Sequence, residues 1–119
     1  MGLGNVEDRV LPRIGVLSPS QRGGALKSQY FTPHTFHHTH AVSGAICIGT
    51  AAKIKGTVAN DVAKVKDRLA EKLVIEHIAG KISVYLELVK NASEWEVKKV
   101  STIRTARKIM DGFVFIPTK

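Results

Sequence analysis

The sequence has very little cysteine and few aromatic residues. Cys47 is the single cysteine among 119 residues, so no disulfide can form within the chain, and we expect a reducing, cytoplasmic location. Phenylalanine, tryptophan and tyrosine make up 6% of the residues, which offers little surface for stacking nucleic-acid bases. These two shortages exclude a disulfide-rich secreted scaffold and argue against a nucleic-acid binder.

A membrane-spanning run and a basic leader are also missing. The stretch from His40 to Ala52 carries no charge, but it is too short and too rich in glycine, serine and threonine to cross a bilayer. The opening residues 1–4 are followed by asparagine and acidic residues, which does not fit a secretory leader. We therefore expect no membrane attachment.

Acidic residues are fewer than basic ones. The chain has 18 Lys and Arg against 10 Asp and Glu, which gives a net charge of +8. The basic residues are scattered or alternate with carboxylates and form no block. This pattern favours a basic surface, or a basic lining for an acidic small molecule, over nucleic acid, although a nucleic-acid binder remains the third alternative. With 44% hydrophobic residues, the chain is expected to fold as one domain, residues 1–119.

The uncharged stretch predicts a central helix. Apolar and small residues occur on every side of its helical wheel, so we expect it to be buried all round. Gly44 and Gly49 allow close approach of neighbouring backbones, and Lys53 and Gly56 fit its carboxyl end. The free N–H groups at its amino end would form an anion site suited to a carboxylate or phosphate.

Other segments predict strands and a second helix. Apolar runs favour strands at 13–17, 25–31, 74–76, 82–89, 95–103 and 113–116, with a brief extended piece at 57–59. Val97 and Val100 fall out of step with the alternation, which predicts a bulge. Asn60 is expected to cap an amphipathic helix from Asp61 to Leu73.

Four segments carry a family resemblance. They are residues 1–14, with Met-Gly-Leu-Gly and Arg-Val-Leu-Pro-Arg-Ile; 37–60, with Ala-Val-Ser-Gly-Ala-Ile-Cys; 77–80; and 104–112, with Arg-Thr-Ala-Arg-Lys-Ile-Met-Asp-Gly. In this order and spacing, over nearly the whole chain, they resemble the carboxy-terminal half of the PrpF family. That family contains cofactor-independent isomerases of the methylaconitate and methylitaconate type.

The resemblance implies a fold and a reaction. The family has the diaminopimelate epimerase-like fold, in which two halves each wrap a sheet around a central helix and the active site lies between them. This chain would then be an α+β half, with a sheet around one buried central helix and a second amphipathic helix outside. The family's reaction removes a proton beside an unsaturated acid and returns it elsewhere, without a cofactor, to shift or invert a double bond.

The resemblance also implies that the chain is incomplete as a catalyst. The lysine and cysteine that move the proton lie in the family's amino-terminal half. We therefore expect a fragment or a stand-alone half that is inactive by itself and needs a matching amino-terminal domain. The alternative is a non-enzymatic orphan domain that self-associates or binds a partner.

The candidate residues would bind substrate and perform no proton transfer. The predicted substrate-binding residues are His37, Ser43, Gly44, His77 and Gly80. The alternative is helix-entry packing for His37 and an ordinary turn for His77 and Gly80. Ser43 and Gly44 would hold substrate through their backbone N–H groups near the first helical turn. The usual His-Pro-Ser-Gly of the family reads His-Ile-Ala-Gly here, without the serine hydroxyl.

Three further sets of residues invite a functional interpretation. Arg104 and Arg107 could clamp a carboxylate or form salt bridges. His34 and His38 have an i,i+4 spacing, but no thiolate or carboxylate joins them, and Pro33 opposes a helix there, so no metal site is predicted. Cys47 is expected to be buried and inert.

Overall fold

The protein is a mixed sheet with two helices. The computed structural model describes residues 2–32, 34–65, 71–92 and 94–117. The strands are β1 (Gly15–Pro19), β2 (Leu26–Thr32), β3 (Thr35–Phe36), β4 (Lys72–His77), β5 (Gly80–Asn91) and β6 (Glu94–Thr102). The helices are α1 (Val42–Lys53) and α2 (Val58–Val62). This composition confirms the predicted α+β class.

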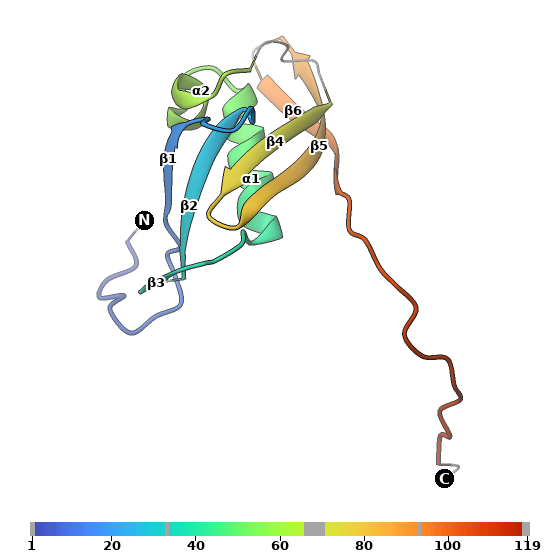
Figure 1. Cartoon of the computed structure of the whole chain (residues 1–119). Helices are drawn as coiled ribbons and strands as arrows, with labels where there is room; N and C mark the ends of the chain where they lie inside the picture. The colour runs from blue at the N-terminus through green and yellow to red at the C-terminus, as the bar shows by residue number, and fades with distance from the viewer. Residues whose placement is uncertain (1, 33, 66–70, 93, 118–119) are drawn as a thin grey trace.

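The sheet has the strand order β1-β2-β4-β5-β6, and the short β3 pairs with β2. The β2–β4 pair is parallel and the other pairs are antiparallel. The connection between β2 and β4 contains both helices, and α1 lies along one face of the sheet (Figure 1). The core forms between the helices and the inward side chains of β2, β4 and β5. Its buried hydrophobic residues are Leu26, Ala45, Ala52, Ala59, Leu73, Ile75, Val84 and Leu86.

The glycines of α1 set how closely the helix approaches the sheet. A Cβ atom on Gly44 would lie 2.6 Å from the ring of Tyr30, and one on Gly49 would lie 2.6 Å from Cγ2 of Val84. Both distances are too short for real contacts, so any side chain here would push the helix away from the sheet. The predicted use of small residues for close approach is confirmed.

The expectation that α1 is buried on every side is wrong. Gly44, Ala45, Gly49 and Ala52 are buried, but Ser43 and Cys47 are exposed on the side away from the sheet. The reason is geometric, because the sheet covers one side of the helix and the described part of the chain places no second layer over Ser43 and Cys47. Consequently, the prediction of a buried Cys47 is also wrong.

The predicted second helix from Asp61 to Leu73 is wrong in its bounds. The helix α2 covers five residues, Val58–Val62, and its N-cap is Thr57, whose hydroxyl accepts the N–H of Asn60 at 3.1 Å. The predicted extended piece at 57–59 is therefore wrong too. Leu73 lies in β4 with only 4% of its surface exposed, because strand pairing with Val84 buries it. The middle of the predicted helix, residues 66–70, lies outside the described residues.

The bulge predicted in the last strand is present. Glu87 pairs with Lys99 and Leu88 pairs with Val97, so Lys98 has no opposite residue on β5. This extra residue explains the broken alternation in β6.

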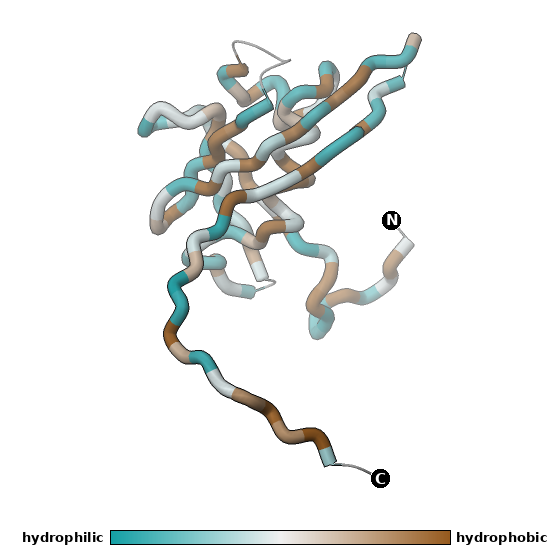
Figure 2. Tube along the Cα trace, turned by 90° about the vertical axis from the view of Figure 1, so that its right-hand side faces the viewer, coloured by the Kyte–Doolittle hydropathy of each residue, from teal (hydrophilic) through white to brown (hydrophobic). Residues whose placement is uncertain are grey.

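The predicted strand at 113–116 is wrong. Residues 103–117 form no helix or strand in the described chain and extend away from the sheet (Figure 1). The far part of this segment is hydrophobic (Figure 2), and Phe113 and Phe115 are 95% and 93% exposed. The sequence pattern there is typical of a strand, but this segment pairs with no strand in the described residues.

Candidate functional site

The amino end of α1 is not capped by a side chain. Ala41 takes the N-cap position, and the first intrahelical bond runs from the N–H of Ala45 to the carbonyl of Ala41 at 2.9 Å. No described side chain caps the preceding N–H groups, and the first turn contains no acidic residue. The positive end of the helix dipole is therefore available at this end of the sheet, beside a group of histidines.

His40 lies immediately before this helix and is 4% exposed. Its Nδ1 donates to the carbonyl of Ala41 at 2.9 Å, so its Nε2 accepts from the hydroxyl of Ser28 at 3.0 Å. The ring packs against Tyr30 with centroids 4.9 Å apart. Burial lowers the pKa of His40, the nearby His77 and His37 add to the effect, and the carbonyl of Ala41 opposes it. His40 is thus held neutral in one orientation.

His77 ends β4 and is 7% exposed. Its Nδ1 is buried and has no hydrogen-bond partner in the described part of the chain. Burial lowers the pKa of His77, and the charges of Arg22 and His37 lower it further. The backbone of Lys81 and of His38 acts in the opposite direction and raises this pKa. A buried polar atom without a partner costs free energy, so His77 is a candidate residue for contact with a ligand.

A cavity of about 440 Å³ brings these two histidines together. It lies where β6 leaves β5, because the β5–β6 pairing begins at Val84 and Thr102 and leaves residues 80–83 unpaired on that side. The lining residues are Thr39, His40, Lys72, His77, Lys81, Ile82, Ser83, Tyr85, Ile103 and Arg104. Three cationic side chains and two histidines face this space with no carboxylate among the lining residues, which is the arrangement expected of an anion site.

The structure gathers only part of the predicted site. His77 lines the cavity, and Gly80 lies beside its ring, since a Cβ on Gly80 would be 3.7 Å from Cε1. His37 is half-buried near Tyr30, with its Nδ1 3.2 Å from the hydroxyl of Thr39, and does not line the cavity.

The other two predicted residues belong to the helix itself. Gly44 packs against Tyr30, and Ser43 is exposed; neither lines the cavity. Their remaining connection to a ligand would be through the uncapped N–H groups of the first turn.

Of the residues that line the cavity, the predicted site contains His77 alone. It omits the other histidine and the three cationic residues, which are His40, Lys72, Lys81 and Arg104. The position of His40 directly before the helix was the available signal. Arg104 was recognised as a possible carboxylate clamp, and no hydrogen bond or ion pair of the described residues engages its guanidinium.

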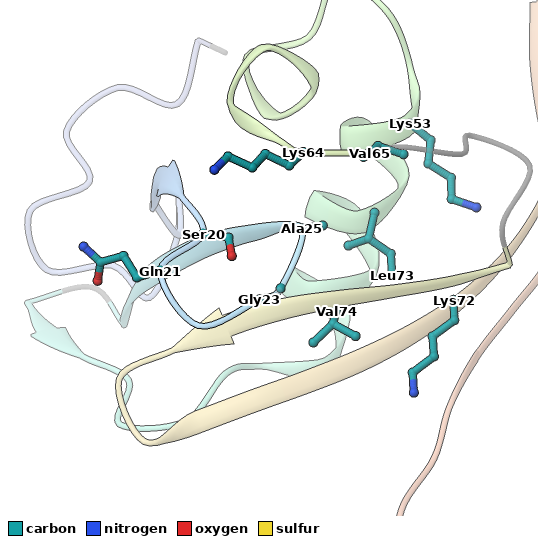
Figure 3. A pocket seen from close by; sticks show the side chains of 11 residues that line it. Ser20, Gln21, Gly23, Ala25, Lys53, Lys64, Val65, Lys72, Leu73 and Val74 are labelled. Carbon is teal, nitrogen blue, oxygen red and sulfur yellow. The ribbon is translucent and has the colours of Figure 1, made fainter.

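Other places in the structure are weaker candidates. Among the described residues, no group of three or more His, Cys, Asp or Glu side chains could hold a metal ion. His34 is exposed in a turn, and its Nε2 donates to the carbonyl of Glu7 at 2.9 Å. A second cavity, of about 580 Å³, is lined by Lys53, Lys64 and Lys72 together with apolar and small residues, but the three ammonium groups point away from one another (Figure 3).

No helix in the described chain combines the length and the hydrophobicity needed to cross a membrane.

Two known proteins with similar sequences are named as isomerases. The chain is 40% identical over 116 residues to the (4E)-oxalomesaconate Delta-isomerase of Novosphingobium sp., covering 98% of this chain and 32% of that protein. It is 39% identical over 92 residues to the 3-methylitaconate isomerase of Eubacterium barkeri, covering 76% of this chain and 23% of that protein. The chain thus spans about a third or less of the length of these relatives.

A solved structure has the same fold. The crystal structure of a methylitaconate-delta-isomerase matches 83% of this chain and 30% of its own chain, with a TM-score of 0.64 and 22% identity. This match confirms the fold expected from the resemblance. The sequence profile of the PrpF protein matches residues 5–117. The chain therefore belongs to the PrpF family.

Proposed function

We propose that this chain supplies the substrate-anchoring side of a cofactor-independent isomerase acting on unsaturated di- or tricarboxylates in the cytoplasm. The observation that carries the proposal is His77, which lines a basic cavity and whose buried Nδ1 has no hydrogen-bond partner among the described residues. The named substrates of the relatives, oxalomesaconate and methylitaconate, support this chemical class.

Each lining group has a distinct part in holding such an anion. The guanidinium of Arg104 can donate two parallel hydrogen bonds to one carboxylate. The imidazole of His77, which lines the cavity, can donate a hydrogen bond to a second carboxylate oxygen, and the charge of Lys81 adds attraction. His40 is committed to Ala41 and Ser28 on both nitrogens, so it forms a fixed wall.

The five residues predicted from the sequence remain part of the proposal with different roles. His77 contacts the anion, and Gly80 lies beside its ring. His37 lies near enough to His77 to contribute to the lowered pKa of His77. Ser43 and Gly44 act through the uncapped backbone of the first helical turn.

We further propose that the single domain, residues 1–119, is inactive alone and requires a matching amino-terminal domain. Support comes from the exposed side of α1 at Ser43 and Cys47 and from the hydrophobic segment 109–116, both of which a partner would cover. The proton-transferring lysine and cysteine would come from that partner.

A reconstitution experiment tests this function. The chain would be mixed with the amino-terminal part of a PrpF relative in deuterium oxide, and deuterium entry into methylitaconate would be followed by NMR. Exchange that needs both parts and is lost with His77→Ala supports the proposal. Absence of exchange in a complex shown to have formed would overturn it.

The second candidate is a non-enzymatic domain that self-associates. The exposed hydrophobic segment 109–116 favours it, because such surface is uncommon on monomers. Concentration-dependent association with no binding of unsaturated dicarboxylates would make it the better interpretation.

A further inference from the structure

The turn that carries His77 lacks the residues that usually make such a turn. His77 pairs with Gly80, so Ile78 and Ala79 form a two-residue connection between β4 and β5. Two-residue hairpins favour turn types with positive φ, usually with glycine or asparagine. Neither Ile78 nor Ala79 has positive φ, and Gly80 does not either. Local sequence preference therefore does not account for this turn, and contacts from elsewhere must hold it.

Arg22, from the loop between β1 and β2, supplies such contacts. Its Nη2 donates to the carbonyl of His77 at 2.6 Å and to the carbonyl of Gly80 at 3.2 Å. One guanidinium nitrogen thus bridges both ends of the turn. The N–H of Ala79 donates to the carbonyl of His38 at 3.2 Å, which ties the tip of the turn to the segment before α1.

Arg22 is itself held in place by one residue of β4 and one of β5. Its backbone N–H donates to Oε1 of Glu76 at 2.7 Å, and Lys81 donates from Nζ to its carbonyl. The same carboxylate accepts the hydroxyl of Ser20 at 3.0 Å and the N–H groups of Gln21 and Gly24 at 2.9 and 2.8 Å. Glu76 has none of its surface exposed, so this loop is anchored on a buried acceptor directly beside His77.

We propose that Arg22 is a positioning residue, which fixes the turn from His77 to Gly80 and so aims the His77 imidazole into the basic cavity. Among the described residues, the hydrogen bonds of the guanidinium go to backbone carbonyls of this turn, and Arg22 does not line the cavity. Its effect on an anion therefore passes through His77. The consequence for ligand binding rests on the proposed function; the positioning itself does not.

Two variants and two controls separate positioning from charge. Arg22→Ala removes both the charge and the hydrogen bonds, whereas Arg22→Lys keeps the charge but loses the planar donor group. Arg13→Ala and Arg13→Lys are the matched controls, because Arg13 is exposed just before β1 and has no part in the turn. The full chain is used throughout.

The first readouts are the ¹⁵N resonances and the NMR titration of the His77 ring. The second is the dissociation constant for trans-aconitate, an unsaturated tricarboxylate that serves as the probe. We expect both Arg22 variants, but neither control, to shift the ring resonances and to weaken binding by about tenfold. Wild-type ring resonances in Arg22→Lys would overturn the proposal, because charge alone would then account for the effect.

The design separates this inference from the proposed function. If wild-type protein fails to bind trans-aconitate but both variants still shift the His77 resonances, positioning is supported and the proposed ligand is wrong. If wild-type protein binds and neither variant changes the His77 ring or the affinity, positioning is wrong and the proposed function stands.

Discussion

Tyr30 and Gly44 are in such close contact that no side chain fits between the sheet and α1 at this point. A Cβ on Gly44 would lie 2.6 Å from Cε2 and 2.8 Å from Cζ of the tyrosine ring. Tyr30 also packs against His40, so the same contact sets the position of the helix start and of a wall of the basic cavity. Packing and site geometry are therefore coupled.

Gly44→Ala should destabilise the protein by about 1–3 kcal/mol through overpacking against Tyr30. Urea unfolding followed by circular dichroism measures this difference. Gly112→Ala is the matched control, because a Cβ there meets nothing within 4 Å and its φ is not positive. Equal stability of the two variants would contradict the described contact.

The charge on Glu76 should make folding sensitive to acid. Burial by itself would raise the pKa of Glu76, but the hydrogen bonds from Gly24, Gln21, Arg22 and Ser20 outweigh it and lower the pKa to about 2. A lowered carboxyl pKa stabilises the fold above the ordinary value of 4.5, and this stability is lost as the pH falls toward 2.

Urea unfolding between pH 2 and pH 6 tests this dependence. Glu76→Gln should be less stable than wild type at pH 6 and should show a weaker loss of stability below pH 4.5. Glu94→Gln is the control, since Glu94 is exposed at the start of β6. If Glu76→Gln loses as much stability below pH 4.5 as the wild type does, the lowered pKa of Glu76 is disproved.

The two buried histidines should destabilise the fold at mildly acidic pH. Burial lowers the pKa of both His40 and His77 below 6.5. The unfolded chain then binds protons near pH 6.5 that the folded chain does not, so the unfolding free energy should decrease as the pH falls below about 7. His40→Gln should reduce this slope, and exposed His34→Gln should leave it unchanged; equal slopes would count against burial of His40 in its neutral form.

Ligand binding should partly reverse the lowering of the His77 pKa. An anion in the basic cavity favours protonated His77, so binding of trans-aconitate should raise the pKa of that ring and take up protons near pH 6. Calorimetry in buffers of different ionisation enthalpy detects the uptake. Binding without proton uptake, or with proton release, would place the anion elsewhere.

The sequence predicted the elements whose local pattern and tertiary contacts agree. The uncharged stretch containing Gly44 and Gly49 became α1, and the apolar run at 82–89 became the centre of β5. The prediction failed where contacts between residues far apart in the sequence determine the secondary structure. Leu73 continues a helical pattern, yet pairing with Val84 places it in a strand.

The site was only partly predictable for the same reason. His77 is recognisable from the family pattern, but Arg22 lies 55 residues away and its guanidinium contacts backbone carbonyls that a sequence pattern does not reveal. The prediction that α1 is buried on every side was wrong because a second layer would have to cover the helix. Residues 103–117 are extended in this structure and do not provide that layer.

Binding of trans-aconitate to the full chain, followed residue by residue by NMR at pH 6, tests the central claim most directly. We predict saturable shifts at His77, Lys81 and Arg104, which line the cavity, and loss of binding by about tenfold in His77→Ala but not in His34→Ala. Absence of saturable shifts at these residues, or equal binding by the two variants, would contradict an anchoring site built around His77.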